Sequence, residues 1–176
     1  MAIRVVSLLP SAIAVLIAMA SWGALGSDDD AGALLAFKAG LTDRGSGVLA
    51  SWNGSTDFCG WEGVACSRGR VVSLSLPSYG LAGVLSPAVG NLTFLQTLNL
   101  SSNWFQGKVP ASIGRLTRLQ TLELSYNAFS GTLPANLSFC TSLLLLRLSS
   151  NRFGVSPLSS VTGSQAFRSF HLQTTV

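Results

Sequence analysis

Charged and titratable side chains are scarce in this sequence. Only 10% of its 176 residues are charged, and its single histidine, His171, lies close to the C-terminus. Histidine is the usual general base and a common metal ligand, so one copy argues against a histidine-pair metal site and against a Ser-His-Asp triad. The sequence also has no Gly-x-Ser-x-Gly elbow and no glycine-rich phosphate loop.

Carboxylates offer no better case for catalysis. Asp43, Asp57 and Glu62 are the candidates for a catalytic pair, but nothing in their spacing brings two of them together. We therefore predict that the chain is not an enzyme and holds neither a cofactor nor a metal.

Long apolar runs are absent beyond the N-terminus. The run over residues 5–20 has 16 residues and contains Pro10, whereas a helix needs about 20 apolar residues to span a bilayer. Arg4 precedes the run, and the small residues that follow it suit a cleavage site. We predict a secretory signal peptide over residues 1–26, no transmembrane segment after its removal, and an extracellular location.

Cysteine is limited to three residues. Because secretion implies an oxidising compartment, disulfides are considered before metal or catalytic roles. Cys59 and Cys66 are the evident pair, and closing so short a loop removes about 2.5 kcal/mol of unfolded-state entropy. That pairing leaves Cys140 without a partner. It falls in the same column of the repeat as Leu116, so we predict a buried thiol in a leucine position, with intermolecular pairing as the alternative.

Acidic residues almost disappear after residue 67. Eight basic residues follow, against the single acid Glu123. Such a surface would attract an acidic partner, including the polyanionic sugars of a cell wall, although scattered solubilising charge is the simpler interpretation. No aromatic residues are interleaved with the basic ones, and together with secretion this argues against nucleic acid as a partner.

Leucine and asparagine recur with a strict 24-residue period. The repeated unit is a Leu-x-Leu triplet followed three residues later by asparagine: Leu98-Asn99-Leu100 with Asn103, Leu122-Glu123-Leu124 with Asn127, and Leu146-Arg147-Leu148 with Asn151. Both leucines of a triplet face the core of a short strand, and a unit of this length must stack on its neighbours. We predict a solenoid in which the asparagines bond to the backbone at turns and Phe105, Phe129 and Phe153 lie in the core.

A different segment precedes the repeats. Ser27 and the aspartates of residues 28–30 stand before Leu34, Phe37 and Leu41, which predicts a capped helix with one apolar face. The aspartates lack the ligand spacing of a calcium site. We predict a cap over residues 27–67, about 3.5 repeats over residues 68–153, and an irregular or disordered tail over residues 154–176.

These residues resemble the plant-type extracellular leucine-rich repeat family of receptor-like kinases, receptor-like proteins and polygalacturonase inhibitors. The resemblance depends on the 24-residue unit, on the segments Gly107-Lys108-Val109-Pro110 and Gly131-Thr132-Leu133-Pro134, and on the cap segment from Cys59 to Cys66. It implies an α/β repeat fold, a short right-handed solenoid with a parallel sheet on its concave face and a helical cap. It also implies a Cys59–Cys66 disulfide and a second short sheet at the Gly-x-Val/Leu-Pro segments.

Family ectodomains usually carry more repeats, a second cysteine-containing cap and, in receptors, a transmembrane helix. Their absence suggests the first part of a longer receptor or inhibitor. Four strands make a sheet about 15 Å wide, which is small against the roughly 800 Å² that each partner buries in a stable interface. A longer leucine-rich repeat receptor that docks at the last coil is therefore one expected partner.

The resemblance places binding of a peptide or protein on the concave face. Candidate contacts are the residues between and just after the paired leucines: Asn99, Thr121, Glu123, Tyr126, Leu145 and Arg147. Tyr126, Glu123 and Arg147 are the strongest candidates because aromatic and charged anchors dominate interfaces, although Glu123 and Arg147 could instead pair with each other. The expected function is recognition in defence or developmental signalling; the alternatives are a secreted inhibitor of a cell-wall-degrading enzyme and a truncated receptor fragment without independent function.

Four Asn-x-Ser/Thr sequons accompany the secretion signal. They begin at Asn53, Asn91, Asn99 and Asn136. Glycosylation at these sites suits an extracellular protein, but a glycan on Asn99 would block the predicted binding face. We therefore expect Asn53 and Asn136 to be the better sites.

Overall fold

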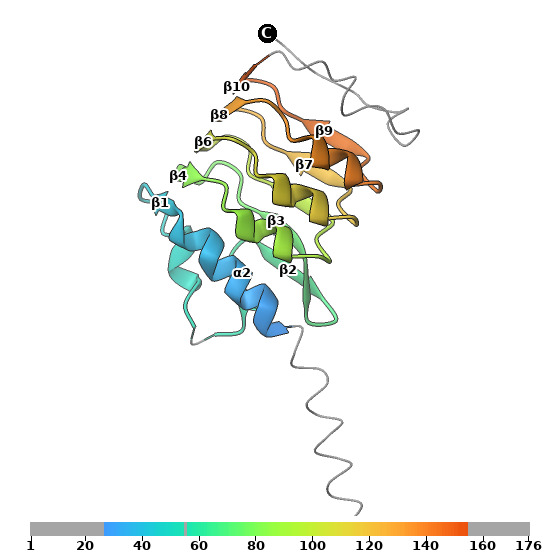
Figure 1. Ribbon diagram of the computed structural model, residues 1–176. Coiled ribbons are helices and arrows are strands. Elements are labelled where there is room, and N and C mark those ends of the chain that lie inside the picture. The colour runs from blue at the N-terminus through green and yellow to red at the C-terminus, as the bar shows by residue number, and fades with distance from the viewer. Residues whose placement is uncertain (1–26, 55, 155–176) are drawn as a thin grey trace, which may run out of the picture.

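The computed structural model describes residues 27–54 and 56–154. The predicted signal peptide over residues 1–26 and the predicted tail beyond Gly154 lie outside this part of the chain. Within it, successive coils stack side by side, and each coil adds one strand to each of two sheets. The helix α2 (Ser27–Ala39) covers one end of the stack (Figure 1).

The leucine triplets form the first sheet, in the order β2-β3-β5-β7-β9. Leu74, Leu98, Leu122 and Leu146 are direct partners on neighbouring parallel strands, which confirms the solenoid and its register. The strands are β2 (Val64–Ser67), β3 (Arg70–Ser75), β5 (Thr97–Asn99), β7 (Thr121–Glu123) and β9 (Leu145–Arg147). The antiparallel strand β2 comes from the cap, for which no strand was predicted.

A second sheet has the order β1-β4-β6-β8-β10. Its strands are β1 (Leu41–Asp43), β4 (Leu81–Val84), β6 (Trp104–Gly107), β8 (Ala128–Gly131) and β10 (Arg152–Phe153). Strands β6 and β8 end at Gly107 and Gly131, so only the glycine of each Gly-x-Val/Leu-Pro segment belongs to the sheet. Since a proline has no N–H to donate, the segment beyond the glycine leaves the ladder. Leu41, predicted on the apolar face of the helix, lies in β1, because the helix ends at Ala39.

Short 3-10 helices, not α-helices, cover the side of each coil opposite the first sheet. They are η3 (Pro87–Asn91), η4 (Ala111–Arg115) and η5 (Ala135–Phe139); two more, η1 (Val48–Ser51) and η2 (Phe58–Gly60), belong to the cap. The stacked turns approach closely at two glycines. A Cβ atom at Gly90 would meet the backbone oxygen of Ser112, and one at Gly114 would meet that of Asn136. These glycines therefore set the spacing of the coils on this side.

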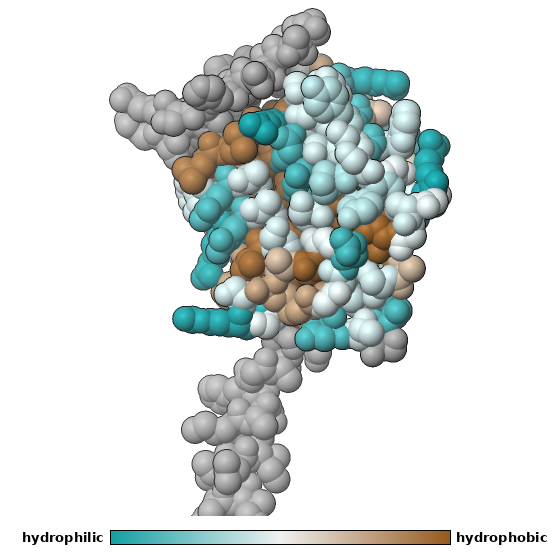
Figure 2. All heavy atoms as spheres, turned by 180° about the vertical axis from the view of Figure 1, so that it is seen from behind, coloured by the Kyte–Doolittle hydropathy of each residue, from teal (hydrophilic) through white to brown (hydrophobic). Residues whose placement is uncertain are grey.

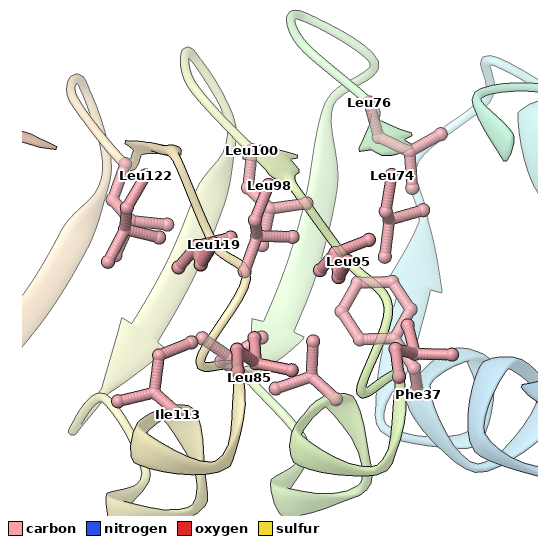
Figure 3. Close-up of a cluster of buried hydrophobic side chains, with 14 of the residues drawn as sticks. Phe37, Leu74, Leu76, Leu85, Leu95, Leu98, Leu100, Ile113, Leu119 and Leu122 are labelled. Atoms are coloured by element: carbon pink, nitrogen blue, oxygen red, sulfur yellow. The ribbon is translucent and has the colours of Figure 1, made fainter. Parts of the chain in front are cut away.

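The core is a single cluster that runs along the stack. Leucines from both triplet positions and from the preceding turns fill it, and Phe37 reaches it from the helix (Figure 3). The predicted core phenylalanines form a row: the ring centroids of Phe37 and Phe105 are 6.2 Å apart, those of Phe105 and Phe129 are 5.9 Å apart, and those of Phe129 and Phe153 are 6.2 Å apart. The sequence did not predict that Phe37 begins this row.

The asparagine of each repeat bonds to its own coil and to the preceding one. The Asn103 amide donates to the carbonyl oxygens of Leu76, Leu100 and Ser101 at 2.6, 3.1 and 3.1 Å. Its Oδ1 accepts from the Leu81 N–H at 3.0 Å. The same four contacts recur at Asn127, whose Nδ2 and Oδ1 use the equivalent groups of the next repeat. These side chains are structural, as the sequence predicted.

The cap is joined to the repeats by a buried ion pair. The Asp30 carboxylate has no solvent exposure and accepts from Arg70 Nε and Nη2 at 2.9 and 2.8 Å and from the Val71 N–H at 2.9 Å. The sequence pattern predicts that the aspartates of residues 28–30 cap the start of the helix. Asp30 instead lies inside helix α2 and binds a residue 40 positions away.

The rest of the cap packs around two tryptophans. Their ring centroids, in Trp52 and Trp61, are 5.4 Å apart, and Trp52 Nε1 donates to the Glu62 carbonyl at 2.9 Å. Cys59 and Cys66 are joined by a disulfide. Together these contacts fix the path of the chain from helix α2 to strand β2.

Candidate functional site

The predicted binding residues lie on the outward side of the first sheet. In each strand the central leucine is buried, so the residues before and after it face away from the core. The strand register places them in two rows across β5, β7 and β9. The first row is Thr97, Thr121 and Leu145, and the second is Asn99, Glu123 and Arg147. We call these six residues, with Tyr126, the strand face.

Two members of the second row use their polar groups to hold the backbone. The Asn99 Oδ1 accepts from the N–H and the hydroxyl of Ser101 at 3.1 and 2.8 Å. Glu123 is only 8% exposed, and its Oε1 accepts from the Ser125 N–H at 3.1 Å. The Asn99 Oδ1 and the Glu123 Oε1 are therefore already engaged by backbone and side-chain groups at the strand ends.

Arg147 differs from its neighbours in the row. Its Nη1 lies 3.4 Å from Glu123 Oε2, and its side chain is 54% exposed. A long contact made by a half-exposed arginine contributes little stability, about 0–1 kcal/mol. The pairing of Glu123 with Arg147, which the sequence left open as an alternative, is thus present, but it leaves most of the guanidinium donors directed to solvent.

Tyr126 provides the aromatic group of the strand face. Its side chain is 63% exposed, and its backbone has φ 57°, in the left-handed region. Ser102 and Ser150 adopt the same conformation in the neighbouring coils, so the turn requires it at each repeat. Tyr126 and Arg147 are the members of the strand face that combine large side chains with high exposure.

The sequons differ in how their asparagines are placed. Asn53, Asn91 and Asn136 are exposed, whereas Asn99 is half-buried and its Oδ1 is used by Ser101. The exposed positions suit glycosylation better than Asn99, and glycosylation at each of the four remains a prediction. Among residues 27–54 and 56–154, no group of three His, Cys, Asp or Glu side chains is arranged to hold a metal ion.

Cys140 lies in the core, and its thiol donates to the Ile113 carbonyl at 3.2 Å. Burial raises the pKa of Cys140 from 9.0 to about 11. Between these values the unfolded chain loses the thiol proton while the folded protein retains it, so stability falls as the pH rises. Below pH 9 the stability that the buried neutral thiol contributes is fully present.

We therefore expect Cys140 to resist iodoacetamide at about pH 8 and to react only as the protein unfolds. The pH dependence of the melting temperature between pH 9 and 11 should be steeper in the wild type than in Cys140→Ala. Rapid alkylation of the folded protein would contradict the buried position.

Comparison with known proteins assigns the family. The profile of the leucine rich repeat N-terminal domain matches residues 27–67, and that of the leucine rich repeat matches residues 94–116 and 118–140. The BIR2 ectodomain from Arabidopsis thaliana, which has a crystal structure, is 35% identical in sequence to this chain. The two structures superpose with a TM-score of 0.66, and the match covers 70% of this chain and 68% of the BIR2 chain. The chain belongs to the plant leucine-rich repeat family.

Its relatives include receptor kinases. Over 80 residues, 44% of this chain, it is 49% identical to the LRR receptor-like serine/threonine-protein kinase EFR of Arabidopsis thaliana, but those residues are only 8% of EFR. In the structure of PEPR1 with AtPEP1, the matched chain is 35% identical in sequence to this one. The match has a TM-score of 0.70 and covers 75% of this chain and 19% of that chain. The leucine-rich repeat chain is thus similar to the ectodomains of plant receptors. No helix in the described residues has the length and hydropathy of a membrane span.

Proposed function

We propose that this leucine-rich repeat chain is an extracellular recognition module that binds a peptide or a protein on its strand face without catalysing a reaction. The observation that carries the proposal is the register of β5, β7 and β9, which aligns the outward residues in two rows. Arg147 belongs to the second row and Tyr126 follows the end of β7, and their exposed side chains supply the guanidinium and aromatic groups that dominate interfaces.

The relatives support this proposal. BIR2 is described as an ectodomain, and the PEPR1 structure contains AtPEP1. By analogy, this chain would act outside the cell, at the plasma-membrane surface or in the cell wall, and its output would depend on a partner. We assign the strongest contribution to Tyr126 and Arg147, and a smaller one to Asn99 and Glu123, whose polar groups already hold Ser101 and Ser125.

A peptide selection tests the proposal. Peptides would be selected from a random library on the full-length chain, and their affinities would be measured for the double variant Tyr126→Ala/Arg147→Ala. We expect a loss of about 30-fold, since two anchors that together contribute about 2 kcal/mol are removed.

The matched control is Trp104→Ala/Arg152→Ala, which removes an exposed tryptophan and an exposed arginine from the second sheet. This variant should bind the selected peptides as the wild type does. Equal losses in both variants, or a loss in the control alone, would refute the assignment to the strand face.

The surplus of basic residues favours a second candidate, an inhibitor of a cell-wall-degrading enzyme. Residues 68–154 contain seven basic side chains and the single acid Glu123. Such a surface suits an enzyme with an acidic surface. Inhibition of a purified polygalacturonase by the full chain would support this candidate, and unchanged hydrolysis rates would remove it.

A further inference from the structure

Two solvent-facing columns of the solenoid change from polar to apolar in the same coil. At successive 24-residue steps, the columns read Asn91, Arg115, Phe139 and Gln96, Gln120, Leu144. The polar members are all exposed, so these columns do not belong to the core. Phe139 and Leu144 are nevertheless 60% and 71% exposed. Large apolar side chains at such positions indicate a contact surface, because solubility alone favours the polar residues of the preceding coils.

The coil that precedes these two apolar residues carries two arginines, Arg115 and Arg118. Phe139 ends η5, which stacks on η4, and η4 ends at Arg115. The Leu144 N–H donates to the Gln120 carbonyl at 2.8 Å, and Gln120 follows Arg118 by two positions. We call Arg115, Arg118, Phe139 and Leu144 the flank patch. Figure 2 shows brown apolar surface on the coil nearest the C-terminal end, with teal side chains below it along the same edge.

Arg118 is held in place without neutralisation of its charge. Its guanidinium carbon lies 4.1 Å from the centroid of the Phe94 ring, and that of Arg70 lies 4.2 Å from the same ring. Arg70 is paired with Asp30, whereas no carboxylate in the described part of the chain forms a salt bridge with Arg118. Stacking uses the face of a guanidinium and leaves its N–H groups available at the edges.

Arg115 adds a second unneutralised cation. Its Nη1 donates to the neutral Oδ1 of Asn91 at 3.1 Å, and no described carboxylate pairs with it. Two guanidinium groups at positions three residues apart thus remain available to an acidic ligand. Arginine and aromatic residues are the types most enriched at protein interfaces.

We propose that the flank patch binds an acidic polypeptide segment that also carries apolar side chains. Carboxylates of the segment bond to Arg115 and Arg118, and its apolar side chains cover Phe139 and Leu144. A polyuronate would match the cations but would leave both apolar residues in water, so the observations favour a polypeptide. The flank patch does not include Tyr126 or Arg147, and its test is therefore independent of the strand face.

The probe is a short synthetic peptide that alternates glutamate and leucine, titrated calorimetrically into the full chain. We expect Arg115→Gln/Arg118→Gln to weaken binding about tenfold or more. Phe139→Asn/Leu144→Gln, which restores the residues found at these columns in an earlier coil, should weaken it by a similar factor. Melting curves of each variant check that the protein remains folded.

Two controls distinguish binding at the flank patch from general charge attraction and from binding at the strand face. Lys108→Gln/Arg152→Gln removes the same net charge from residues at the second sheet, and Tyr126→Ala/Arg147→Ala alters the strand face. Both should bind the peptide within about twofold of the wild type. The proposal is overturned if the peptide does not bind, or if the Lys108/Arg152 variant loses as much affinity as the Arg115/Arg118 variant. It is also overturned if polygalacturonate binds the flank patch more tightly than the peptide.

Discussion

Replacing Arg70 by methionine is expected to lower the free energy of unfolding by about 3–5 kcal/mol, because it leaves a buried carboxylate without its cation. Asp30 has no solvent exposure, and of the hydrogen bonds that its carboxylate accepts from Arg70 and Val71, only the one from the Val71 N–H would remain. The variant also loses the contact of the Arg70 guanidinium with Phe94. Urea denaturation followed by circular dichroism would measure the effect.

A double variant tests the cause of this loss. In Asp30→Leu/Arg70→Met both charges are absent, so we expect the protein to be more stable than Arg70→Met alone, as is observed when buried ion pairs are replaced by apolar residues. Arg147→Met serves as the matched control, because the contact of Arg147 with Glu123 is long, 3.4 Å, and the Arg147 side chain is 54% exposed, so its loss should cost less than about 1 kcal/mol. If Arg70→Met and Arg147→Met had similar stabilities, the ion pair would not hold the cap.

The second large effect is expected for Asn103→Ala. Asn103 is 5% exposed, and its removal takes a hydrogen bond from three carbonyls and from the Leu81 N–H. Each unsatisfied buried group costs about 1–3 kcal/mol, and since water recovers part of that cost we expect a total near 3–5 kcal/mol. The same denaturation experiment, combined with amide exchange at Leu81, would measure it.

Asn136→Ala is the control for Asn103→Ala. Asn136 is exposed, and the atoms that it places close to Gly114 are its backbone oxygen and its Cβ, which alanine retains. We expect a change within about 0.5 kcal/mol, the usual range for surface positions. Equal destabilisation by the two substitutions would mean that the asparagine contacts across coils do not stabilise the solenoid.

Periodic features of the fold could be predicted from the sequence, because the same residue types recur at the same positions of each repeat. The alignment of Leu98, Leu122 and Leu146 as partners on adjacent strands follows from a strict 24-residue step. The roles of Asn103 and Asn127 follow from the same step, since a buried amide at a turn must bond to the backbone.

Features that depend on contacts distant in sequence could not be predicted in this way. The pair of Asp30 and Arg70 spans 40 positions, and the local pattern of Asp30 fits helix capping equally well. Strand β2 was missed because it becomes a strand only through its antiparallel pairing with β3. For the candidate site, alternation predicted the outward rows, but the burial of Glu123 depends on Ser125 and Arg147 around it.

The directional bonding of the asparagines has a consequence for how such a protein can lengthen. Asn127 binds the Leu100 carbonyl and the Phe105 N–H of the coil before it, so every such turn is completed by a side chain that its successor supplies. A duplicated 24-residue module inserted after residue 127 would therefore close the preceding turn by itself and require no change upstream. Gene duplication within such an array can therefore add one coil at a time without altering the sequence of the coils already present.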